Sequence, residues 1–340
     1  MIDGHGDDVF RYGGNVKVNF STNIYQGVDH TGLMNHLMSC TELLSNYPEP
    51  EPVSVEKILS ETYGMPVDNI IVTNGATEAI YLIARKMSGA SSAVVVPTFR
   101  EYQDACAMCG HSVRFVPEYE VYNGALSACN VDVVWLCNPN NPTGMVFNRE
   151  ELLKIIDSKP ETLFVIDQAY ADYSVVKVLE ASDVLSRGNV IMLQSLTKQF
   201  AVPGLRIGYA IAPTEIVSGL RAMRMPWSVN SFAIKASHYL LKHREDYHID
   251  KDQLYKEAMW ISHAFHCLGI ECHGSDCNFI LCRLPKGNAS QLKEWLMEKY
   301  GLLIRDASNF ETLDHLYFRV AAQDHKSNEL LVKCIEEWMS

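Results

Sequence analysis

The stretch "SLTKQFAVPGLRIGYA", residues 195–210, places two long cations in a segment that is otherwise mostly apolar. Lys198 follows Ser195 and Thr197, and Arg206 stands eight residues later. A buried lysine is costly unless it is paired or neutral, and loss of solvation lowers its pKa. A neutral lysine is a nucleophile that forms imines with carbonyl compounds. The alternative is a lysine whose stem packs while its amine reaches water, so the rest of the chain has to decide.

The overall composition is that of an ordinary globular protein. The chain has 340 residues, of which 47% are hydrophobic and 21% charged, enough for one large domain and a smaller one. Its net charge of −12 argues against binding to nucleic acid or to an anionic membrane surface. No apolar run approaches the ~18 residues of a membrane span. The polar, acidic start "MIDGHGDDVFRYGG" is not typical of a signal peptide, so we expect a cytoplasmic protein.

The ten cysteines lack the spacing of a disulfide framework, which also favours a reducing compartment. Cys106 and Cys109 have the C-x-x-C spacing of a redox or zinc site, and Cys272, Cys277 and Cys282 cluster later. No second pair or nearby histidine pattern completes a four-ligand set, and a helix would place Cys106 and Cys109 on one face. We therefore predict no metal site.

Short apolar segments alternate with helical stretches, the pattern of an α/β sheet covered by helices on both faces. The expected strands are 69–73, 92–97, 112–117, 131–138, 162–168, 190–195 and 206–212. A long helical region, about 231–268, precedes further strands and helices that indicate a smaller α+β domain. We predict a large domain over 40–230 and a small domain made of 1–39 and 231–340, with an N-terminal arm.

Polar motifs follow several of the expected strands, at the sheet edge where open α/β proteins bind ligands. In "NGATEAI" (74–80) a glycine turn opens a helix, and the free amides of Gly75, Ala76 and Thr77 could seat an anion. The alternative there is an ordinary N-capping turn. In "NPNNPTG" (138–144) two prolines fix a rigid loop that aims the Asn141 amide.

Asp167 is the first charge after the apolar segment "TLFVI", and Tyr170 follows it closely. A carboxylate in apolar surroundings requires a cationic partner. An anion seat, a buried acid and a lysine together match the needs of pyridoxal phosphate. That cofactor needs a lysine for its aldehyde, an anion site for its phosphate, and a carboxylate that keeps its ring nitrogen protonated.

The motifs "NGATEA", "PTFREY", "NPNNPTG", "DQAYADY" and "SLTKQFAVPGLRIGY" resemble those of the class I and II aminotransferases, pyridoxal-phosphate enzymes of fold type I. The resemblance covers essentially the whole chain in the family's order and spacing. It implies a large, mostly parallel sheet covered by helices, a smaller α+β domain, and attachment of the cofactor to Lys198 as an imine. One departure is Gln168, where the family usually has glutamate.

The same resemblance implies roles for further residues, with Lys198, Asp167 and Tyr170 as the catalytic ones. Asp167 would pair with the pyridine nitrogen, and Asn141 and Tyr170 would hydrogen-bond the ring's 3-oxygen. Tyr102 would stack on the ring. The cofactor phosphate would be held by Ala76, Thr77, Ser195 and Arg206. Tyr47 resembles the tyrosine that such enzymes lend to the neighbouring subunit's phosphate, which implies a homodimer.

Two branches of the family take phosphorylated substrates, the histidinol-phosphate aminotransferases and the threonine-phosphate decarboxylases of cobalamin biosynthesis. The segments "GHGDDVFRYGGNVKVNFSTNI", "MPWSVNSFA" and "LLIRDASNFETLDHLYFRVA" resemble the decarboxylases more closely. The resemblance implies decarboxylation of an O-phosphorylated amino acid, above all L-threonine O-3-phosphate, to (R)-1-aminopropan-2-yl phosphate. Transamination of histidinol phosphate stays open, as does a catalytically silent homologue that only binds the cofactor.

By the same resemblance, Arg319 would bind the substrate carboxylate. Arg305, Asn23 and His5 would gather around the substrate phosphate, with His5 coming from the other subunit. The sequence departs from the branch at "HGDD", where a second glycine is usual. The alternative for His5 is a solvated chain terminus.

Overall fold

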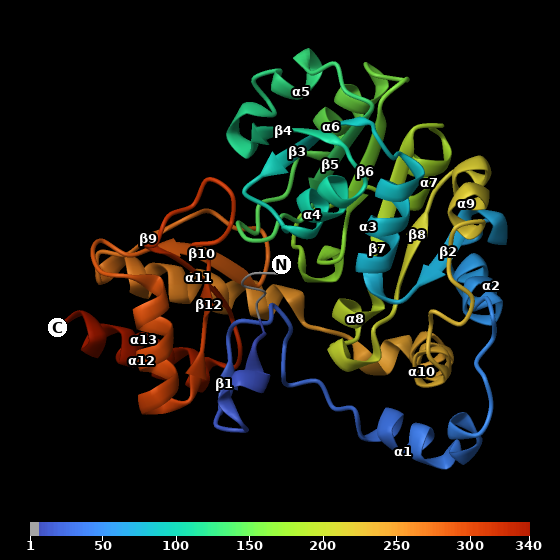
Figure 1. Ribbon diagram of the computed structural model, residues 1–340. Helices are drawn as coiled ribbons and strands as arrows, with labels where there is room; N and C mark the ends of the chain where they lie inside the picture. The colour runs from blue at the N-terminus through green and yellow to red at the C-terminus, as the bar shows by residue number, and fades with distance from the viewer. Residues whose placement is uncertain (1–6) are drawn as a thin grey trace.

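The computed structural model describes residues 7–340, which are built around a central seven-stranded sheet (Figure 1). The strand order is β2-β8-β7-β6-β5-β3-β4, and every strand except β8 runs in the same direction. The strands are β2 (Ile70–Thr73), β3 (Ser91–Val96), β4 (Ser112–Pro117), β5 (Val133–Cys137), β6 (Leu163–Asp167), β7 (Val190–Gln194) and β8 (Gly208–Ile211). The sequence prediction of these seven strands is confirmed to within two residues at each end.

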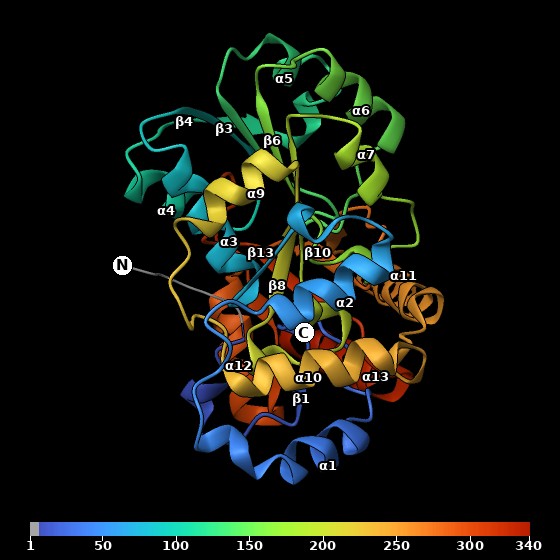
Figure 2. The same cartoon turned by 90° about the vertical axis from the view of Figure 1, so that its right-hand side faces the viewer.

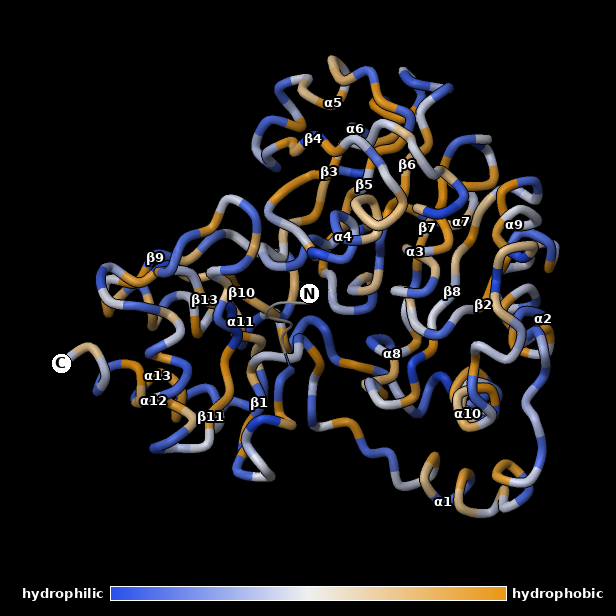
Figure 3. Tube along the Cα trace, in the orientation of Figure 1, coloured by the Kyte–Doolittle hydropathy of each residue, from blue (hydrophilic) through white to orange (hydrophobic). Residues whose placement is uncertain are grey.

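The strands at the middle of this sheet are hydrophobic along their whole length because helices cover both faces. All five residues of β5, "VVWLC", are buried. Successive side chains point to opposite faces, so in β2 Ile71 joins one core cluster while Ile70 and Val72 join the other. In Figure 3 the hydrophobic residues are concentrated along these strands.

Helices cover the two faces of this sheet, as Figure 2 shows. One face carries α3 (Gly75–Lys86), α4 (Glu101–Met108) and α9 (Thr214–Arg221). The other carries α2 (Val53–Tyr63), α5 (Ala125–Ala128), α6 (Arg149–Asp157) and α7 (Ala181–Leu185). The expected large α/β sheet is therefore present.

A second, smaller unit is built on an antiparallel sheet with the order β12-β13-β10-β9. Its strands are β9 (Glu271–Cys272), β10 (Phe279–Arg283), β12 (Arg305–Asp306) and β13 (Tyr317–Ala321). Beside it, β1 (Val18–Asn19) pairs in parallel with β11 (Leu302–Leu303). A separate core cluster joins this sheet to α11 (Lys251–Cys267), α12 (Ala289–Tyr300) and α13 (His325–Met339).

The long helical region expected over 231–268 is two helices, α10 (Ser231–Lys242) and α11. Asn230 and Asp250 cap their N-termini by accepting hydrogen bonds from backbone N–H groups of the first turn. Buried residues of α10 belong to the core of the large sheet, and α10 packs on α1 (Thr31–Ser39) and α2. Within residues 7–340, no helix combines the length and apolar character that a bilayer span requires.

Candidate active site

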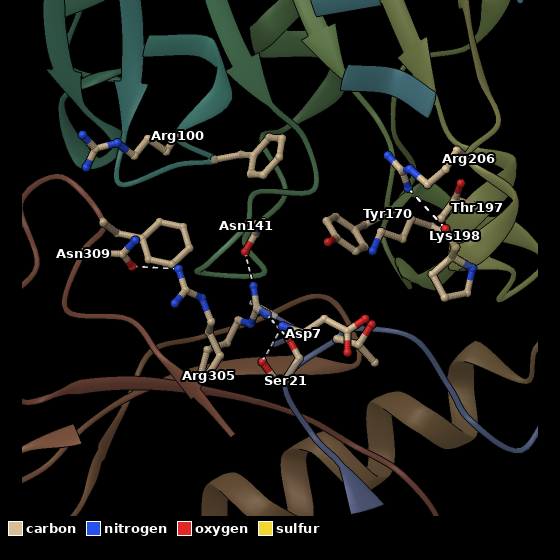
Figure 4. Close-up of a pocket in the computed structure, with 15 residues that line it drawn as sticks. Asp7, Ser21, Arg100, Asn141, Tyr170, Thr197, Lys198, Arg206, Arg305 and Asn309 are labelled. Atoms are coloured by element: carbon tan, nitrogen blue, oxygen red, sulfur yellow. Dashed lines mark hydrogen bonds between the residues drawn. The ribbon is translucent and has the colours of Figure 1, made fainter. Parts of the chain in front are cut away.

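Two adjoining cavities lie beyond the carboxyl ends of β5, β6 and β7, facing the smaller sheet. Figure 4 shows the residues that line one of them. We call the one of about 190 Å³ the inner cavity and the one of about 310 Å³ the outer cavity. They share six lining residues: Phe99, Asn141, Tyr170, Thr197, Lys198 and Arg206. The motifs singled out in the sequence therefore meet at one place.

Lys198 stands between the two cavities on α8 (Leu196–Gln199), a single turn that directly follows β7. Its Nζ lies 5.5 Å from the centre of the Tyr170 ring. Burial, helped by the charges of Arg319 and Arg206, lowers the pKa of Lys198 to about 8. A larger fraction of this amine is therefore neutral and nucleophilic near neutral pH than for an ordinary lysine.

Asp167 ends β6 at the wall of the inner cavity, where it is 4% exposed. Its carboxylate accepts hydrogen bonds from the Tyr102 hydroxyl at 2.8 Å and from the Ala169 N–H at 2.9 Å. Burial nevertheless raises the pKa of Asp167. Among residues 7–340 no basic side chain lies within ion-pair distance of it, so a cationic group on a ligand would stabilise its ionised form.

Tyr102, for which the resemblance implies stacking on the cofactor ring, lines the inner cavity from α4. Its hydroxyl is bonded to Asp167, and its ring stacks on Trp135 with 5.9 Å between the ring centres. The contact with Asp167 makes Tyr102 a support for the carboxylate. Phe99, in the loop just before α4, lines both cavities and is a second aromatic side chain that could cover a ligand's ring.

The N-terminus of α3 and the start of β8 form the anion-seat wall of the inner cavity. Gly75 has φ 74, and a Cβ there would lie 2.7 Å from Nη2 of Arg206. A Cβ on Gly208 would lie 2.5 Å from the backbone nitrogen of Ala76. The N-cap residue Asn74 does not cap the first turn of α3 with its side chain, and Ala76, Thr77, Ser195 and Arg206 all line this cavity. These donors suit a phosphate.

Arg305 and Arg319 stand opposite each other on β12 and β13 at the wall of the outer cavity. They are 7% and 4% exposed, and burial lowers the pKa of Arg305 to about 10 and that of Arg319 to about 9. In the described part of the chain, neither guanidinium has a carboxylate within ion-pair distance. Two buried neighbouring cations without an acid indicate a site for an anionic ligand.

Each of these arginines is nevertheless held in place by hydrogen bonds to neutral groups. Arg319 donates to the Asn141 side-chain oxygen and to the backbone oxygen of Ser21. Arg305 donates to the Asn309 side-chain oxygen at 2.7 Å. The Asn138–Gly144 loop thus connects the cofactor side of the site to the substrate side (Figure 4).

Four of the residues expected at or near the site lie elsewhere or are not described. Asn23 is fully buried next to the Tyr170 hydroxyl, with φ 56, but lines neither cavity. Tyr47 is 87% exposed and rests against Trp227. Gln168 is buried and accepts a hydrogen bond from Gln194 at 3.0 Å. His5 lies outside the described residues.

The outer cavity also has lining residues that the sequence analysis did not single out. They are Asp7, Ser21, Thr22, Phe99, Arg100, Thr197, Pro203, Asn309 and Phe310. Most of them lie inside segments that carried the resemblance, such as "PTFREY" and "NFETL". The motifs of those segments were the sequence signal from which these lining residues could have been predicted.

The comparisons with known proteins agree with this geometry. Residues 15–335 match the family Aminotransferase class I and II. The crystal structure of L-threonine-O-3-phosphate decarboxylase from Porphyromonas gingivalis has a TM-score of 0.92 at 37% identity, covering 95% of this chain and 99% of that one. Histidinol-phosphate aminotransferase of Desulfitobacterium hafniense is 29% identical over 90% of this chain and 87% of its own. The pyridoxal-5'-phosphate complex of histidinol-phosphate aminotransferase from Sinorhizobium meliloti has a TM-score of 0.88 at 19% identity, covering 100% and 95%.

The chain belongs to the class I and II aminotransferase family and has its fold. It is an enzyme that depends on pyridoxal phosphate, and its relatives are both decarboxylases and aminotransferases. The residues present fit that cofactor on independent grounds. Asp167 is a buried acid with no ion-pair partner among the described residues, and Lys198 is a lysine of lowered pKa. The N-terminus of α3 offers amides that the Asn74 side chain leaves uncapped, beside Arg206.

Proposed function

We propose that this enzyme decarboxylates an O-phosphorylated amino acid, L-threonine O-3-phosphate, to (R)-1-aminopropan-2-yl phosphate and carbon dioxide. The observation that carries the proposal is the pair Arg305 and Arg319, buried side by side with no acidic partner among residues 7–340. A substrate with a carboxylate and a phosphate brings two anionic groups to this wall. The P. gingivalis decarboxylase, named for that substrate, supports the same choice.

On the cofactor side, the residues keep the roles that the family resemblance implies, with one change. Asp167 would hold the proton of the pyridine nitrogen, and Asn141 and Tyr170 would bond the 3-oxygen. Phe99 would cover the ring, and Tyr102 would hold Asp167. The phosphate would be bound by the amides of Ala76 and Thr77 together with Ser195 and Arg206. When bound, pyridoxal phosphate supplies an aldehyde carbon for Lys198 and a ring that takes up the electron pair of a breaking bond.

On the substrate side, Arg319 would orient the carboxylate and Arg305 the phosphate, with Asn23 and the undescribed His5 as further phosphate ligands. Orientation decides the reaction, because the bond at the α-carbon that stands perpendicular to the ring is the one that breaks. Once the carboxylate has left as carbon dioxide, the α-carbon needs a proton. Lys198 is the donor we assign, since its Nζ lies between the two cavities.

The second candidate is transamination, favoured by the likeness to histidinol-phosphate aminotransferases. Histidinol phosphate has no carboxylate, so with that substrate Arg319 would serve only the oxo acid of the second half-reaction. A decarboxylase uses both arginines in every turnover. With the proposed product, the enzyme would act in cobalamin biosynthesis. The ten free thiols favour the reducing cytoplasm as its location.

We also propose a homodimer in which Tyr47 reaches the partner's cofactor phosphate. Large apolar side chains near Tyr47 are exposed in the single chain, among them Leu44 (83%), Met225 (69%) and Trp227 (51%). Exposed apolar patches of this kind mark interaction sites. Sedimentation of the purified protein should give twice the mass of one chain, and Leu44→Asp should shift it towards the monomer.

The test of the function is a substrate panel on the purified holoenzyme. Threonine phosphate, serine phosphate and histidinol phosphate are each supplied with and without 2-oxoglutarate, while carbon dioxide and glutamate are measured separately. We expect sustained release of carbon dioxide from threonine phosphate without the oxo acid. Turnover only with 2-oxoglutarate, accompanied by glutamate, would assign the enzyme to the aminotransferases. A protein that binds the cofactor but turns over none of the three would be a silent homologue.

A further inference from the structure

An ion pair between the N-terminal segment and the smaller unit is buried beside the outer cavity. Nζ of Lys293, on α12, lies 2.7 Å from Oδ2 of Asp8. Lys293 and Asp8 are only 7% and 6% exposed. Lysine and aspartate are rarely buried to this extent unless they are paired, so the contact fixes where the segment runs.

Neighbouring contacts fasten the same segment. The Tyr12 ring centre lies 5.8 Å from Nζ of Lys293, and the Tyr12 hydroxyl donates to Glu294 at 2.9 Å. Arg11 approaches the same Asp8 oxygen at 3.4 Å. The turn η1 (Val9–Tyr12) is thus attached to the middle of α12.

The residue that precedes Asp8 lies at the outer cavity. Asp7 accepts a hydrogen bond from the Asn19 side chain at 2.6 Å and donates its backbone N–H to Ser21 at 3.2 Å. Its φ is 62, in the left-handed region that aspartate tolerates at a cost. Contacts on either side along the chain must hold the backbone of Asp7 in that conformation. The ion pair between Asp8 and Lys293 supplies one of these contacts.

Asp7 is the one acidic side chain among the described residues that line the outer cavity. Five basic ones line the same cavity: Arg100, Lys198, Arg206, Arg305 and Arg319. A cavity with only cations would bind any small polyanion. Asp7 and Lys198 both line this cavity, as Figure 4 shows, so Asp7 faces the space through which a substrate's amino group must approach that lysine.

We propose that Asp7 is a specificity-determining residue that receives the ammonium group of the substrate, and that Asp8 and Lys293 are the positioning pair that holds it there. The ligand class is a phosphorylated amino acid, and anions without an amino group are disfavoured. This inference rests on the proposed function and extends it to the choice between amino-bearing and amino-free anions.

The test compares three variants with wild type. Asp7→Asn removes the charge. Asp8→Asn combined with Lys293→Met removes the pair without leaving a lone buried charge. Lys299→Met is the control, because Lys299 is on the same helix but 49% exposed and bonded to Glu337. The first readout is the KM for threonine phosphate divided by the inhibition constant of inorganic phosphate. The second, on the cofactor-free protein, is the rate of tryptic cleavage after Arg11, which follows local detachment of the segment.

We expect the ratio to rise about tenfold in the Asp7 variant and in the double variant. Cleavage after Arg11 should be faster in the double variant, and the Lys299 control should leave both readouts unchanged. An unchanged ratio in Asp7→Asn overturns the proposal, as does a double variant that is cleaved faster with its ratio unchanged. If wild type turns over no phosphorylated amino acid, the proposed function fails, and calorimetric affinity for threonine phosphate takes the place of KM in the same ratio.

Discussion

Of the substitutions in the site, Asp167→Asn should best leave the fold intact while it impairs the chemistry. The asparagine oxygen can still accept a hydrogen bond from the Ala169 N–H. The asparagine amide group can donate to the Tyr102 oxygen, which lies 2.8 Å from the Asp167 carboxylate in the wild-type protein. The volume is unchanged. The cofactor-free variant should therefore fold with the same secondary structure.

The stability of the cofactor-free variant should even rise at neutral pH. Burial raises the pKa of Asp167 above 3.8, so ionisation of this group destabilises the folded state once the pH exceeds that value. The cost is absent at low pH, where the carboxyl is protonated in both states. The melting temperature of the variant relative to wild type should therefore increase as the pH is raised from about 4 to 7.

The chemistry should suffer, because a neutral amide cannot hold a pyridinium proton. A hydrogen bond to a charged group contributes about 1.5–3 kcal/mol, so its loss should weaken cofactor binding roughly tenfold to hundredfold. Loss of an electrostatic contact in the transition state typically lowers kcat by a further ~10²–10³. Cofactor absorbance and carbon dioxide release measure the two effects. A variant with near wild-type kcat, or one that is less stable without cofactor, would refute this account of Asp167.

Other residues of the site give further predictions. Borohydride reduction of the holoenzyme should fix the cofactor on the peptide that contains Lys198, and Lys198→Ala should abolish turnover; label on another lysine would contradict the assignment. Arg206→Leu should release cofactor on dialysis about tenfold or more faster while saturated turnover changes little, and unchanged retention would count against it. Outside the two cavities, the buried carboxylate of Glu118 accepts hydrogen bonds from the side chains of Asn140 and Thr143. Burial raises the pKa of Glu118 from 4.5 to about 7, so Glu118→Gln should gain up to ~3 kcal/mol of stability at pH 8 and almost none at pH 4; equal differences in melting temperature at both pH values would show that this carboxyl does not titrate in that range.

The large sheet could be predicted from the sequence because its strands are buried on both faces and therefore consist of continuous runs of apolar residues. The motifs follow those strands directly, so the gathering of Lys198, Asp167, Asn141 and Arg206 at one sheet edge is a consequence of the parallel topology. The roles within the gathered set stay predictions.

The contacts that depend on tertiary packing could not be predicted. The hydroxyl of Tyr102 meets Asp167 across 65 residues, a distance that no local pattern encodes. The ion pair of Asp8 and Lys293 spans 285 residues, and its sequence signal was only the departure "HGDD" from the glycine usual there. The break between α10 and α11 could be inferred only from Asp250, which caps the N-terminus of α11. Asp250 stands in a run of mostly polar, helix-forming residues, so the pattern predicts one continuous helical region.

The central claim is that both arginines of the outer cavity serve a substrate that loses its carboxylate. The most direct measurement is the number of carbon dioxide molecules released per active site from threonine phosphate labelled in the carboxyl carbon, with no oxo acid present. We expect many carbon dioxide molecules per active site, with an equal amount of aminopropanol phosphate formed. No more than one turnover per site, ending with the cofactor in its amine form and the label still on the organic product, would contradict it.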